Sequence, residues 1–594
     1  MPSHEHDENI FLSHIHDEGY QEPYTTRPAL ADSLVTASYE GATEKLDGVW
    51  HYHADQYDTA LRAGWFAEPY ADESGTPIPW DFDFDQWPTM RLPATWNTRD
   101  ERLFYYEESV VFARSFRFVR GGERSVLLRF NAVAYAATVF LNGAYVGSHE
   151  GASTPFVVDV TDAIAEDNRI VVVVENRRRR DRVPMSNTDW FNYGGIHRSV
   201  ELLRLPASYV RDFTLALVPG SDFSRISFSA SVTGEDGGSV RLEVPELGID
   251  RRIDVAGGVA SCDLEAKPEL WSPEHPRLYD VRVSRGDHVA VDRIGFREIR
   301  REGNEIVLNG KPIFLRGASM HEDSPTNGRT LAEAEIRENF ALVKELGGNF
   351  ARLAHYPHNG LASRIADEVG ILLWEEIPVY WAIAFDSDET LAAASNQLAE
   401  LIRRDSNRAS VVIWSVGNEN PDTDARLVFM RTLAERAREL DGTRLVSAAC
   451  LVDHVANRIA DRLADHLDVI GLNEYMGWYE PDFSKLPDLF ENSRPDKPVI
   501  VTEFGGGALA GHHGSRDEMF TEENQAWIYE RQTRTIGSIP YIKGMSPWIL
   551  YDFRSPKRAN RFQRGYNRKG LLSEDKRHRK AAFYVLQEFY RSMV

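Results

Sequence analysis

Two acidic residues in the last third of the chain each end an apolar, β-branched run. Glu419 follows residues 411–418, and Glu503 follows residues 499–502. Such runs are typical of strands that are buried on both faces of a parallel sheet. Parallel barrels carry their catalytic groups at the C-terminal ends of these strands. Two carboxylates that meet there could cleave a sugar acetal, because one can protonate the leaving oxygen while the other meets the oxocarbenium charge.

The region that contains both acids alternates between strand and helix patterns. Helical stretches, such as the one at residues 332–346, separate eight apolar runs. We predict strands at residues 314–319, 350–355, 371–376, 411–419, 445–449, 469–475, 499–504 and 545–552. Eight strand–helix units predict a C-terminal (β/α)8 TIM barrel over residues 299–594, with Glu419 ending strand four and Glu503 ending strand seven.

The upstream regions read as all-β. Residues 31–205 hold short alternating strands, with Asn142-Gly143 as a hairpin turn, and predict a β-sandwich. Residues 206–298 predict an immunoglobulin-like β-sandwich. Residues 1–30 form a polar N-terminal tail whose histidines could bind a metal but are better explained as a flexible segment.

Composition excludes several classes of function. A net charge of −23 argues against nucleic acid as a partner, because phosphate binding needs a basic face. We expect no membrane association, since no apolar run approaches the ~20 residues of a span. Cys262 and Cys450 are the only cysteines, so no disulfide framework is indicated. The acidic start of the chain lacks a secretion-signal pattern, and we expect a cytoplasmic protein.

Several motifs in this order resemble glycoside hydrolase family 2. They are residues 190–198, 352–357, 417–420 and 502–505, placed after two β-sandwiches and inside a barrel. The resemblance implies a retaining double displacement with Glu419 as acid/base and Glu503 as nucleophile. It further implies that the β-sandwich of residues 31–205 is jelly-roll-like and sugar-binding-like. It also implies a homo-oligomer, a dimer or tetramer, and no cofactor or metal.

Residues near the two acids fit these roles. Arg352 is a candidate cation to keep Glu503 ionised, and in the family pattern the amide of Asn418 contacts the sugar 2-hydroxyl. His321 and His355 could bind a metal, but no closely spaced histidine pair supports that reading. We therefore expect both histidines to bind sugar hydroxyls or to order the carboxylates.

A basic segment follows the last predicted strand. Residues 554–569 hold seven cations and no acid, in a chain that is otherwise strongly acidic. A sugar carboxylate would be attracted by such a field, whereas a neutral hexose would not need it. The alternative is a solvated loop, or a loop that clamps a neighbouring subunit.

Part of this segment resembles the Asn-x-Lys element with which β-glucuronidases of the family hold the sugar carboxylate. Asn567 would donate an amide hydrogen bond and Lys569 would supply a point charge. The chain has Gln563 where those enzymes carry an arginine, and Arg564 follows it. The resemblance implies further substrate contacts by Asp159, Asn473, Tyr475, Trp548 and Arg564, with Trp548 stacking on the sugar ring.

The sequence thus predicts a retaining exo-β-glycosidase that hydrolyses terminal β-D-glucuronides, with a small-molecule or oligosaccharide glycoside as substrate. A β-galacturonidase and a neutral β-galactosidase or β-mannosidase remain open alternatives. Two other classes predict different outcomes: a non-catalytic sugar-binding protein would tolerate loss of either glutamate, and a metal-dependent hydrolase would be stopped by a chelator.

Overall fold

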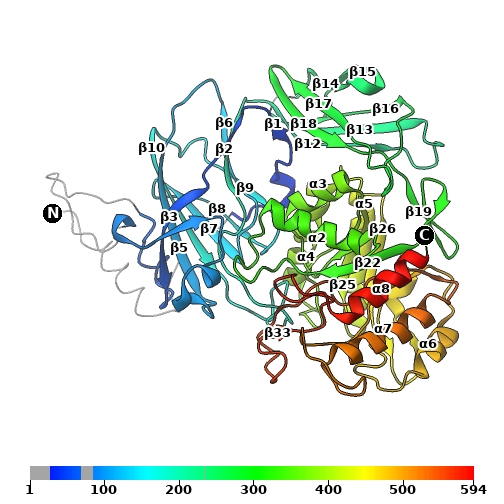
Figure 1. The fold of residues 1–594 in the computed structure, drawn as a ribbon. Coiled ribbons are helices and arrows are strands. Elements are labelled where there is room, and N and C mark those ends of the chain that lie inside the picture. The colour runs from blue at the N-terminus through cyan, green and yellow to red at the C-terminus, as the bar shows by residue number, and fades with distance from the viewer. Residues whose placement is uncertain (1–26, 68–83, 235, 594) are drawn as a thin grey trace. The chain divides into compact units, whose positions relative to one another are not determined.

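The computed structural model describes residues 27–67, 84–234 and 236–593 (Figure 1). The N-terminal histidines at positions 4, 6, 14 and 16 lie outside the described residues. The chain divides into two compact units: residues 1–33, 44–177 and 193–206 form the first, and residues 34–43, 178–192 and 207–594 form the second. The boundaries at 205/206 and 298/299 that were inferred from the sequence stay predictions.

The first unit is a β-sandwich of a six-stranded and a four-stranded antiparallel sheet, as expected. Trp50 and Trp96 are fully buried in its core. The larger sheet runs β4 (Thr89–Leu92), β3 (Gly48–Asp55), β5 (Ser109–Arg117), β10 (Asp167–Glu175), β7 (Ala136–Leu141), β8 (Ala144–Glu150), and the smaller runs β2 (Thr43–Lys45), β11 (Val200–Leu205), β6 (Ser125–Phe130), β9 (Phe156–Asp159). Asn142 and Gly143 both have positive φ and form the predicted turn between β7 and β8.

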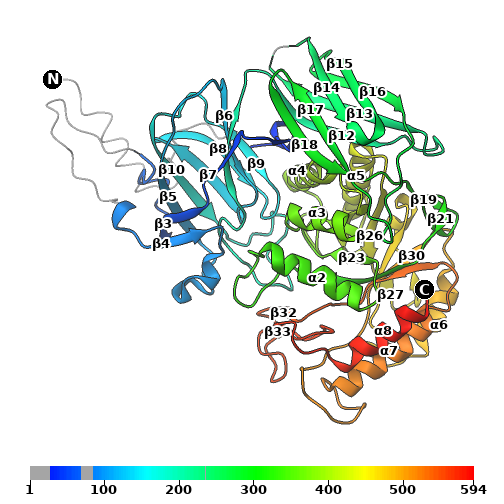
Figure 2. The same cartoon turned by 45° about the horizontal axis from the view of Figure 1, so that its top comes forward.

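The second unit begins with the immunoglobulin-like sandwich, which is drawn in green at the top of Figure 2. One sheet runs β1 (Ser38–Tyr39), β18 (His288–Ile294), β17 (Tyr279–Arg285), β14 (Ser239–Val244), β15 (Ile249–Asp254), and the other runs β12 (Tyr209–Leu217), β13 (Arg225–Thr233), β16 (Val259–Glu265). A small sheet of β19 (Ile299–Glu302), β20 (Glu305–Leu308) and β21 (Lys311–Pro312) leads into the next element.

The rest of the second unit is a closed, eight-stranded parallel barrel, which confirms the predicted fold class. Its strands are β22 (Leu315–Met320), β23 (Phe350–Leu353), β24 (Leu372–Glu376), β25 (Val411–Asn418), β26 (Leu445–Cys450), β29 (Ile470–Asn473), β30 (Val499–Glu503) and β31 (Ile542–Met545). Every residue of β25 and β30 is buried, as expected for strands covered on both faces. Phe350, Leu372, Ile413 and Ile500 belong to one apolar cluster inside this unit.

Helices surround the barrel strands (Figure 1). They are α2 (Glu333–Glu345), α3 (Gly360–Val369), α4 (Asp388–Asp405), α5 (Asp424–Leu440), α6 (Lys485–Ser493), α7 (Glu522–Ile536) and α8 (Ala581–Ser592). Polar N-caps fix where several of them begin; the Ser387 and Thr521 side chains, for example, accept hydrogen bonds from Thr390 and Asn524. No helix among the described residues has the length and apolar character needed to cross a membrane.

One connection of the barrel differs from the regular strand–helix pattern. Between β26 and β29 the chain forms a hairpin, β27 (Val452–Asp453) and β28 (Arg458–Ile459), and a short 3-10 helix, Arg462–His466, instead of an α-helix.

The predicted eighth strand at residues 545–552 is wrong, because the barrel strand is β31 and ends at Met545. The misleading run contains Ile549, Leu550 and Tyr551, which are fully buried outside the barrel sheet.

Candidate active site

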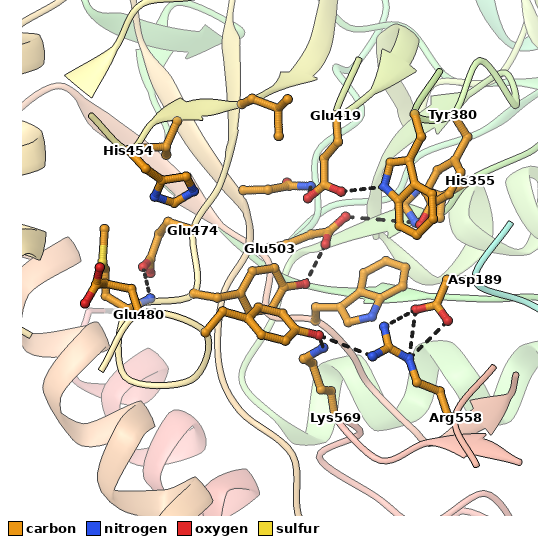
Figure 3. Close-up of a pocket in the computed structure, with 18 residues that line it drawn as sticks. Asp189, His355, Tyr380, Glu419, His454, Glu474, Glu480, Glu503, Arg558 and Lys569 are labelled. Carbon is orange, nitrogen blue, oxygen red and sulfur yellow. Dashed lines mark hydrogen bonds and ion pairs between the residues drawn. The ribbon is translucent and has the colours of Figure 1, made fainter. Parts of the chain in front are cut away.

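A cavity of about 440 Å³ opens at the C-terminal ends of the barrel strands, within the second unit. Glu419 and Glu503 both line it, as Figure 3 shows. Glu503 is the last residue of β30, and Glu419 directly follows β25. The two acids that the sequence placed in strands four and seven therefore face one space.

Glu503 is held as a carboxylate by one cation and one hydroxyl. Arg352 of β23 is fully buried and donates from Nη1 to Glu503 Oε1 at 2.8 Å. Tyr475, just beyond β29, donates its hydroxyl to Glu503 Oε2 at 2.5 Å. His355 Nε2 lies 3.9 Å from Oε1. A hydrogen bond to each oxygen fixes the orientation of the carboxylate.

Glu376 of β24 contacts both Arg352 and His355. Its carboxylate accepts hydrogen bonds from Arg352 Nη2 at 3.0 Å and from Trp374 Nε1 at 2.8 Å, and lies 2.7 Å from His355 Nδ1. Burial alone would raise the pKa of Glu376, but Arg352 and His355 lower it to about 2. The residue is thus a permanent anion that positions Arg352 and His355, as a structural acid would.

Glu419 has a different environment. Trp381 Nε1 donates to its Oε2 at 2.8 Å, and Asn473 Nδ2 donates to its Oε1 at 3.0 Å. Burial raises the pKa of Glu419, the charge of Glu503 raises it further, and the two hydrogen bonds only partly oppose this. The residue has a positive φ of 51°, a strained conformation that the backbone bond from Glu419 N–H to the Ala449 carbonyl, 2.8 Å long, helps to hold.

Two amides and a hydroxyl connect the acids. Asn418 Oδ1 accepts from Arg352 Nη2 at 2.7 Å and from Asn473 Nδ2 at 3.1 Å. Asn473 Oδ1 accepts from the Thr502 hydroxyl at 2.7 Å, which fixes the orientation of the Asn473 amide. Asn418 Nδ2 is buried and has no hydrogen-bond partner in the described part of the chain. Asn418 is not among the residues that line the cavity, so its contact with a sugar hydroxyl stays a prediction.

Aromatic side chains form one wall of the cavity. The Trp548 ring stacks on His355, with centroids 4.7 Å apart and planes 23° apart, and both residues line the cavity. His321 lies behind them, where its Nδ1 is 3.1 Å from the Tyr356 hydroxyl. Burial, together with His355 and other nearby positive groups, lowers the pKa of His321 well below its usual value, so His321 is neutral.

Lys569 reaches the same cavity. Its ammonium donates to the Tyr479 hydroxyl at 2.7 Å and lies 4.9 Å from the Tyr475 ring centroid. No acidic partner of Lys569 is found among the described residues. Its charge is therefore available to an anion in the cavity, beside the tyrosine that holds Glu503.

Asp189 and Arg558 also line the cavity, and the sequence did not single them out for it. Arg558 Nε donates to Asp189 Oδ1 at 3.1 Å, and Arg558 Nη1 approaches the Tyr479 hydroxyl at 3.4 Å. Arg558 was one of seven cations in a single run, with nothing to set it apart. Asp189 was adjacent to the motif at 190–198, and that adjacency is the signal that could have found it.

Four residues for which the resemblance implies substrate contacts do not line the cavity: Asn418, described above, and three others. Asn567 is buried and donates its amide to Asp189 at 3.3 Å, so it contacts a residue of the cavity wall and not the cavity itself. Arg564 is exposed and donates to the Arg561 carbonyl. Asp159 belongs to the first unit and accepts the Thr161 N–H at 2.8 Å. Their substrate contacts stay predictions.

Two of the seven cations of the basic segment are paired with acids of the protein itself. Arg568 pairs with Asp552 and Glu574, and Arg558 pairs with Asp189. Of the seven cations, Arg558 and Lys569 are the ones that line the cavity. Because Arg558 is already paired with Asp189, Lys569 is the cation of this segment that lines the described cavity without an acidic partner.

Metal chemistry has no candidate site here. Over residues 27–67, 84–234 and 236–593, no group of three or more histidine, cysteine, aspartate or glutamate side chains could hold an ion. The arrangement can supply one ionised carboxylate, one carboxyl of raised pKa, and donors for hydroxyl groups, which is the set that acetal cleavage requires.

Comparisons with known proteins give the same family along the chain. The models for the glycosyl hydrolases family 2 TIM barrel domain and sugar binding domain match residues 299–594 and 43–206, and a third model, described as glycosyl hydrolases family 2, matches residues 217–297. The β-glucuronidase of Rattus norvegicus is 28% identical over 606 residues, covering 92% of this chain and 90% of that protein. The β-glucuronidase of Paenibacillus borealis is 28% identical over 593 residues, covering 90% and 95%.

Solved structures agree. The β-galacturonidase of Eisenbergiella tayi bound to galacturonate superposes with a TM-score of 0.81 at 26% identity, covering 93% of this chain and 98% of that one. A β-glucuronidase from an uncultured Clostridium superposes with a TM-score of 0.83 at 26% identity, covering 94% and 100%. With the two glutamates in place at the ends of β25 and β30, the chain belongs to glycoside hydrolase family 2.

Proposed function

We propose that the protein is a retaining exo-β-glucuronidase. The observation that carries the proposal is Lys569, a buried ammonium without an acidic partner among the described residues, in the same cavity as Glu419 and Glu503. A uronic acid carries a carboxylate that would pair with the ammonium of Lys569. Relatives with the name β-glucuronidase, across mammals and bacteria, support the choice of sugar.

In the first half of the reaction, Glu503 attacks the anomeric carbon while Glu419 gives its proton to the leaving oxygen. Arg352 and Tyr475 keep Glu503 ionised and oriented until its charge moves into the new bond. Asn418 offers its free amide N–H to the 2-hydroxyl, where a hydrogen bond strengthens as the oxocarbenium ion develops.

In the second half, Glu419 acts as base for the attacking water. Once Glu503 is esterified, its negative charge is gone, and one of the influences that raise the pKa of Glu419 disappears. The carboxylate then removes a proton from water, and the β-anomer is released. We expect the two carboxyl carbons to lie about 5–5.5 Å apart, as retention requires.

The test is a panel of four chromogenic β-glycosides: glucuronide, galacturonide, galactoside and mannoside. We expect glucuronide to have the highest kcat/KM, with the β-anomer formed first by NMR. A β-galacturonide is the second candidate, because the structure bound to galacturonate shares this fold and a uronic acid would meet the same lysine. A highest rate on a neutral sugar would end the uronic-acid proposal.

Lys569→Ala separates recognition from catalysis. We expect kcat/KM for the glucuronide to fall by about 100-fold or more, since the substrate carboxylate would lose its partner, while any residual galactosidase activity stays unchanged. Arg561→Ala is the matched control, because it removes an exposed cation of the same segment. Equal losses on both substrates would show that Lys569 acts structurally.

Two further properties stay proposals. We infer a dimer or tetramer from the family resemblance, which size-exclusion chromatography with light scattering would measure. We also infer a cytoplasmic enzyme, which fractionation of the source cells would test. We expect no loss of activity with a chelator, and complete loss in both Glu419→Gln and Glu503→Gln, which a sugar-binding protein would not show.

A further inference from the structure

The cavity has a second end that the reaction steps above do not use. Figure 3 shows His454, Glu474 and Glu480 on the side away from Asp189, Arg558 and Lys569, with the two catalytic glutamates between them. Leu451, Val452 and Met476 line the cavity as well. This end is built by the β27–β28 hairpin and by the loop after β29.

The hairpin lies next to the acid/base in the backbone. The Ala449 carbonyl accepts the Glu419 N–H at 2.8 Å, and Leu451 follows two residues later. The turn itself is fixed because Asp453 Oδ1 accepts the N–H groups of Val455 and Ala456, each at 2.9 Å. Since Glu419 protonates the leaving oxygen, the aglycone departs on the side of Glu419, where Leu451 lies.

Positive charge is concentrated at the opposite end. Among the described residues that line the cavity, the lysines and arginines are Arg558 and Lys569. On the hairpin side the acids are Glu474 and Glu480. Glu480 is paired with Lys485 at 2.5 Å, and burial raises the pKa of Glu474 to about 8, so it is mostly uncharged at neutral pH. Leu451 presents an apolar side chain that is 37% exposed.

From this asymmetry we propose that Leu451, with Val452, Met476 and Glu480, selects glycosides by the charge of the aglycone. The favoured substrates carry an uncharged, apolar aglycone such as an aryl or alicyclic alcohol. An anionic aglycone would place its charge against the apolar side chain of Leu451. His454 lines this wall of the described cavity but no lysine or arginine does, and Glu480 there is already paired with Lys485. The inference rests on the proposed glucuronidase function.

The test compares two aryl β-glucuronides that differ at one ring position, a neutral carboxamide and a charged carboxylate. We expect kcat/KM for the carboxylate to be lower by about 10-fold or more. Leu451→Lys should raise the carboxylate-to-carboxamide ratio of kcat/KM by about 5-fold or more. Because the ratio is compared between enzymes, the different reactivity of the two leaving groups cancels.

Val455→Lys is the matched control. It adds the same charge to the same hairpin, but Val455 is 100% exposed and does not line the cavity. We expect it to leave the ratio unchanged. Glu480→Gln is a second variant that should raise the ratio, because it removes a carboxylate and frees Lys485. An unchanged ratio in both Leu451→Lys and Glu480→Gln would overturn the inference.

Failure of this inference differs from failure of the proposed function. If both aryl glucuronides are hydrolysed and the ratio of their kcat/KM values is the same in the wild type, Leu451→Lys and Glu480→Gln, the aglycone inference alone is wrong. If neither glucuronide is hydrolysed while a neutral glycoside is, the proposed function is wrong.

Discussion

At the scale of single residues, Glu419 and Glu503 share a cavity but have opposite surroundings. Glu503 receives hydrogen bonds from a guanidinium and from a phenol hydroxyl, one on each oxygen. Glu419 receives only neutral N–H donors, from Trp381 and Asn473, and is buried near the charge of Glu503. The difference in environment, and not a difference in residue type, supports the proposed assignment of Glu419 to proton transfer and Glu503 to attack.

Trp381→Phe tests the source of the Glu419 pKa. The indole N–H stabilises the ionised carboxylate, so its removal should raise the pKa of Glu419. The acid must be protonated to give its proton, and activity is lost as the pH rises through its pKa. The alkaline limb of kcat/KM should therefore move to higher pH, by about one unit. A limb that stays in place or moves to lower pH would show that Trp381 does not set this pKa.

Tyr475 and Tyr479 lie on one loop and should give different phenotypes. Tyr475→Phe removes the hydroxyl that binds Glu503, and kcat should fall by about 10- to 100-fold on every substrate. Tyr479→Phe removes the hydroxyl that binds Lys569 and approaches Arg558, so it should impair uronides and spare neutral glycosides. Steady-state kinetics of both variants on a uronide and on a neutral glycoside would test this. The same loss in both variants on both substrates would contradict the separate roles.

Sequence reasoning at this scale succeeded where a motif belongs to one strand end. Glu419, Glu503 and Arg352 each follow or end a buried run, so alternation and strand order bring them together. It failed for Asp189 and Arg558, which are distant in sequence and meet only through the folded loops of the second unit. The ion pair between Asp189 and Arg558 leaves no periodic pattern in the sequence.

At the scale of elements, the return from the last barrel strand was the hardest segment to predict. Residues 546–552 are apolar and buried like a strand, whereas β31 itself contains Lys543 and Gly544. A buried ion pair fixes this return: Lys580, at the start of α8, donates to Asp552 Oδ1 at 2.7 Å, and both side chains are 0% exposed. Lys580 also donates to the Ala508 carbonyl at 2.7 Å, which joins the loop after β30 to the same point.

Lys580→Met should destabilise the barrel. Asp552 would keep Arg568 but lose its closest cation in a buried site, at a cost of about 2–4 kcal/mol in the free energy of unfolding. Arg579→Met is the adjacent control, since its pair with Glu345 is partly exposed, at 28% and 40%, and should contribute less than about 1 kcal/mol. Urea unfolding followed by tryptophan fluorescence compares them, and equal midpoints would contradict the role given to Lys580.

At the scale of the whole molecule, periodicity alone was enough to predict the three architectures. Alternation of period two gave the sandwiches, and the change to strand–helix units gave the barrel. It could not predict that residues 178–192, which precede the end of the first sandwich in sequence, belong to the unit that contains the barrel. That assignment depends on contacts such as the one from Gln397 to the Val183 carbonyl, at 2.9 Å.

The buried carboxyls also determine how stability depends on pH. The pKa of Glu376 is about 2 in the folded state, so its stabilising effect is present above its unfolded pKa and is lost as the pH falls towards 2. The pKa of Glu474 is about 8 because of burial, so its effect is present below its unfolded pKa and is lost as the pH rises towards 8. Lowering the pH below the ordinary glutamate pKa therefore removes the stabilising effect of Glu376, whereas raising the pH above it removes that of Glu474.

Glu474→Gln isolates the alkaline part of this dependence. The amide keeps an oxygen for the Met476 N–H, which Glu474 Oε2 accepts at 2.8 Å, but it cannot ionise. The wild type should lose stability between about pH 5 and pH 8, and the variant should lose less over the same interval. Glu480→Gln is the control, because Glu480 is paired with Lys485 and its pKa is lowered by that contact, so its ionisation does not oppose folding in this range. Thermal midpoints measured across the interval test the idea, and parallel curves for the wild type and Glu474→Gln would mean that Glu474 is already ionised inside the folded protein.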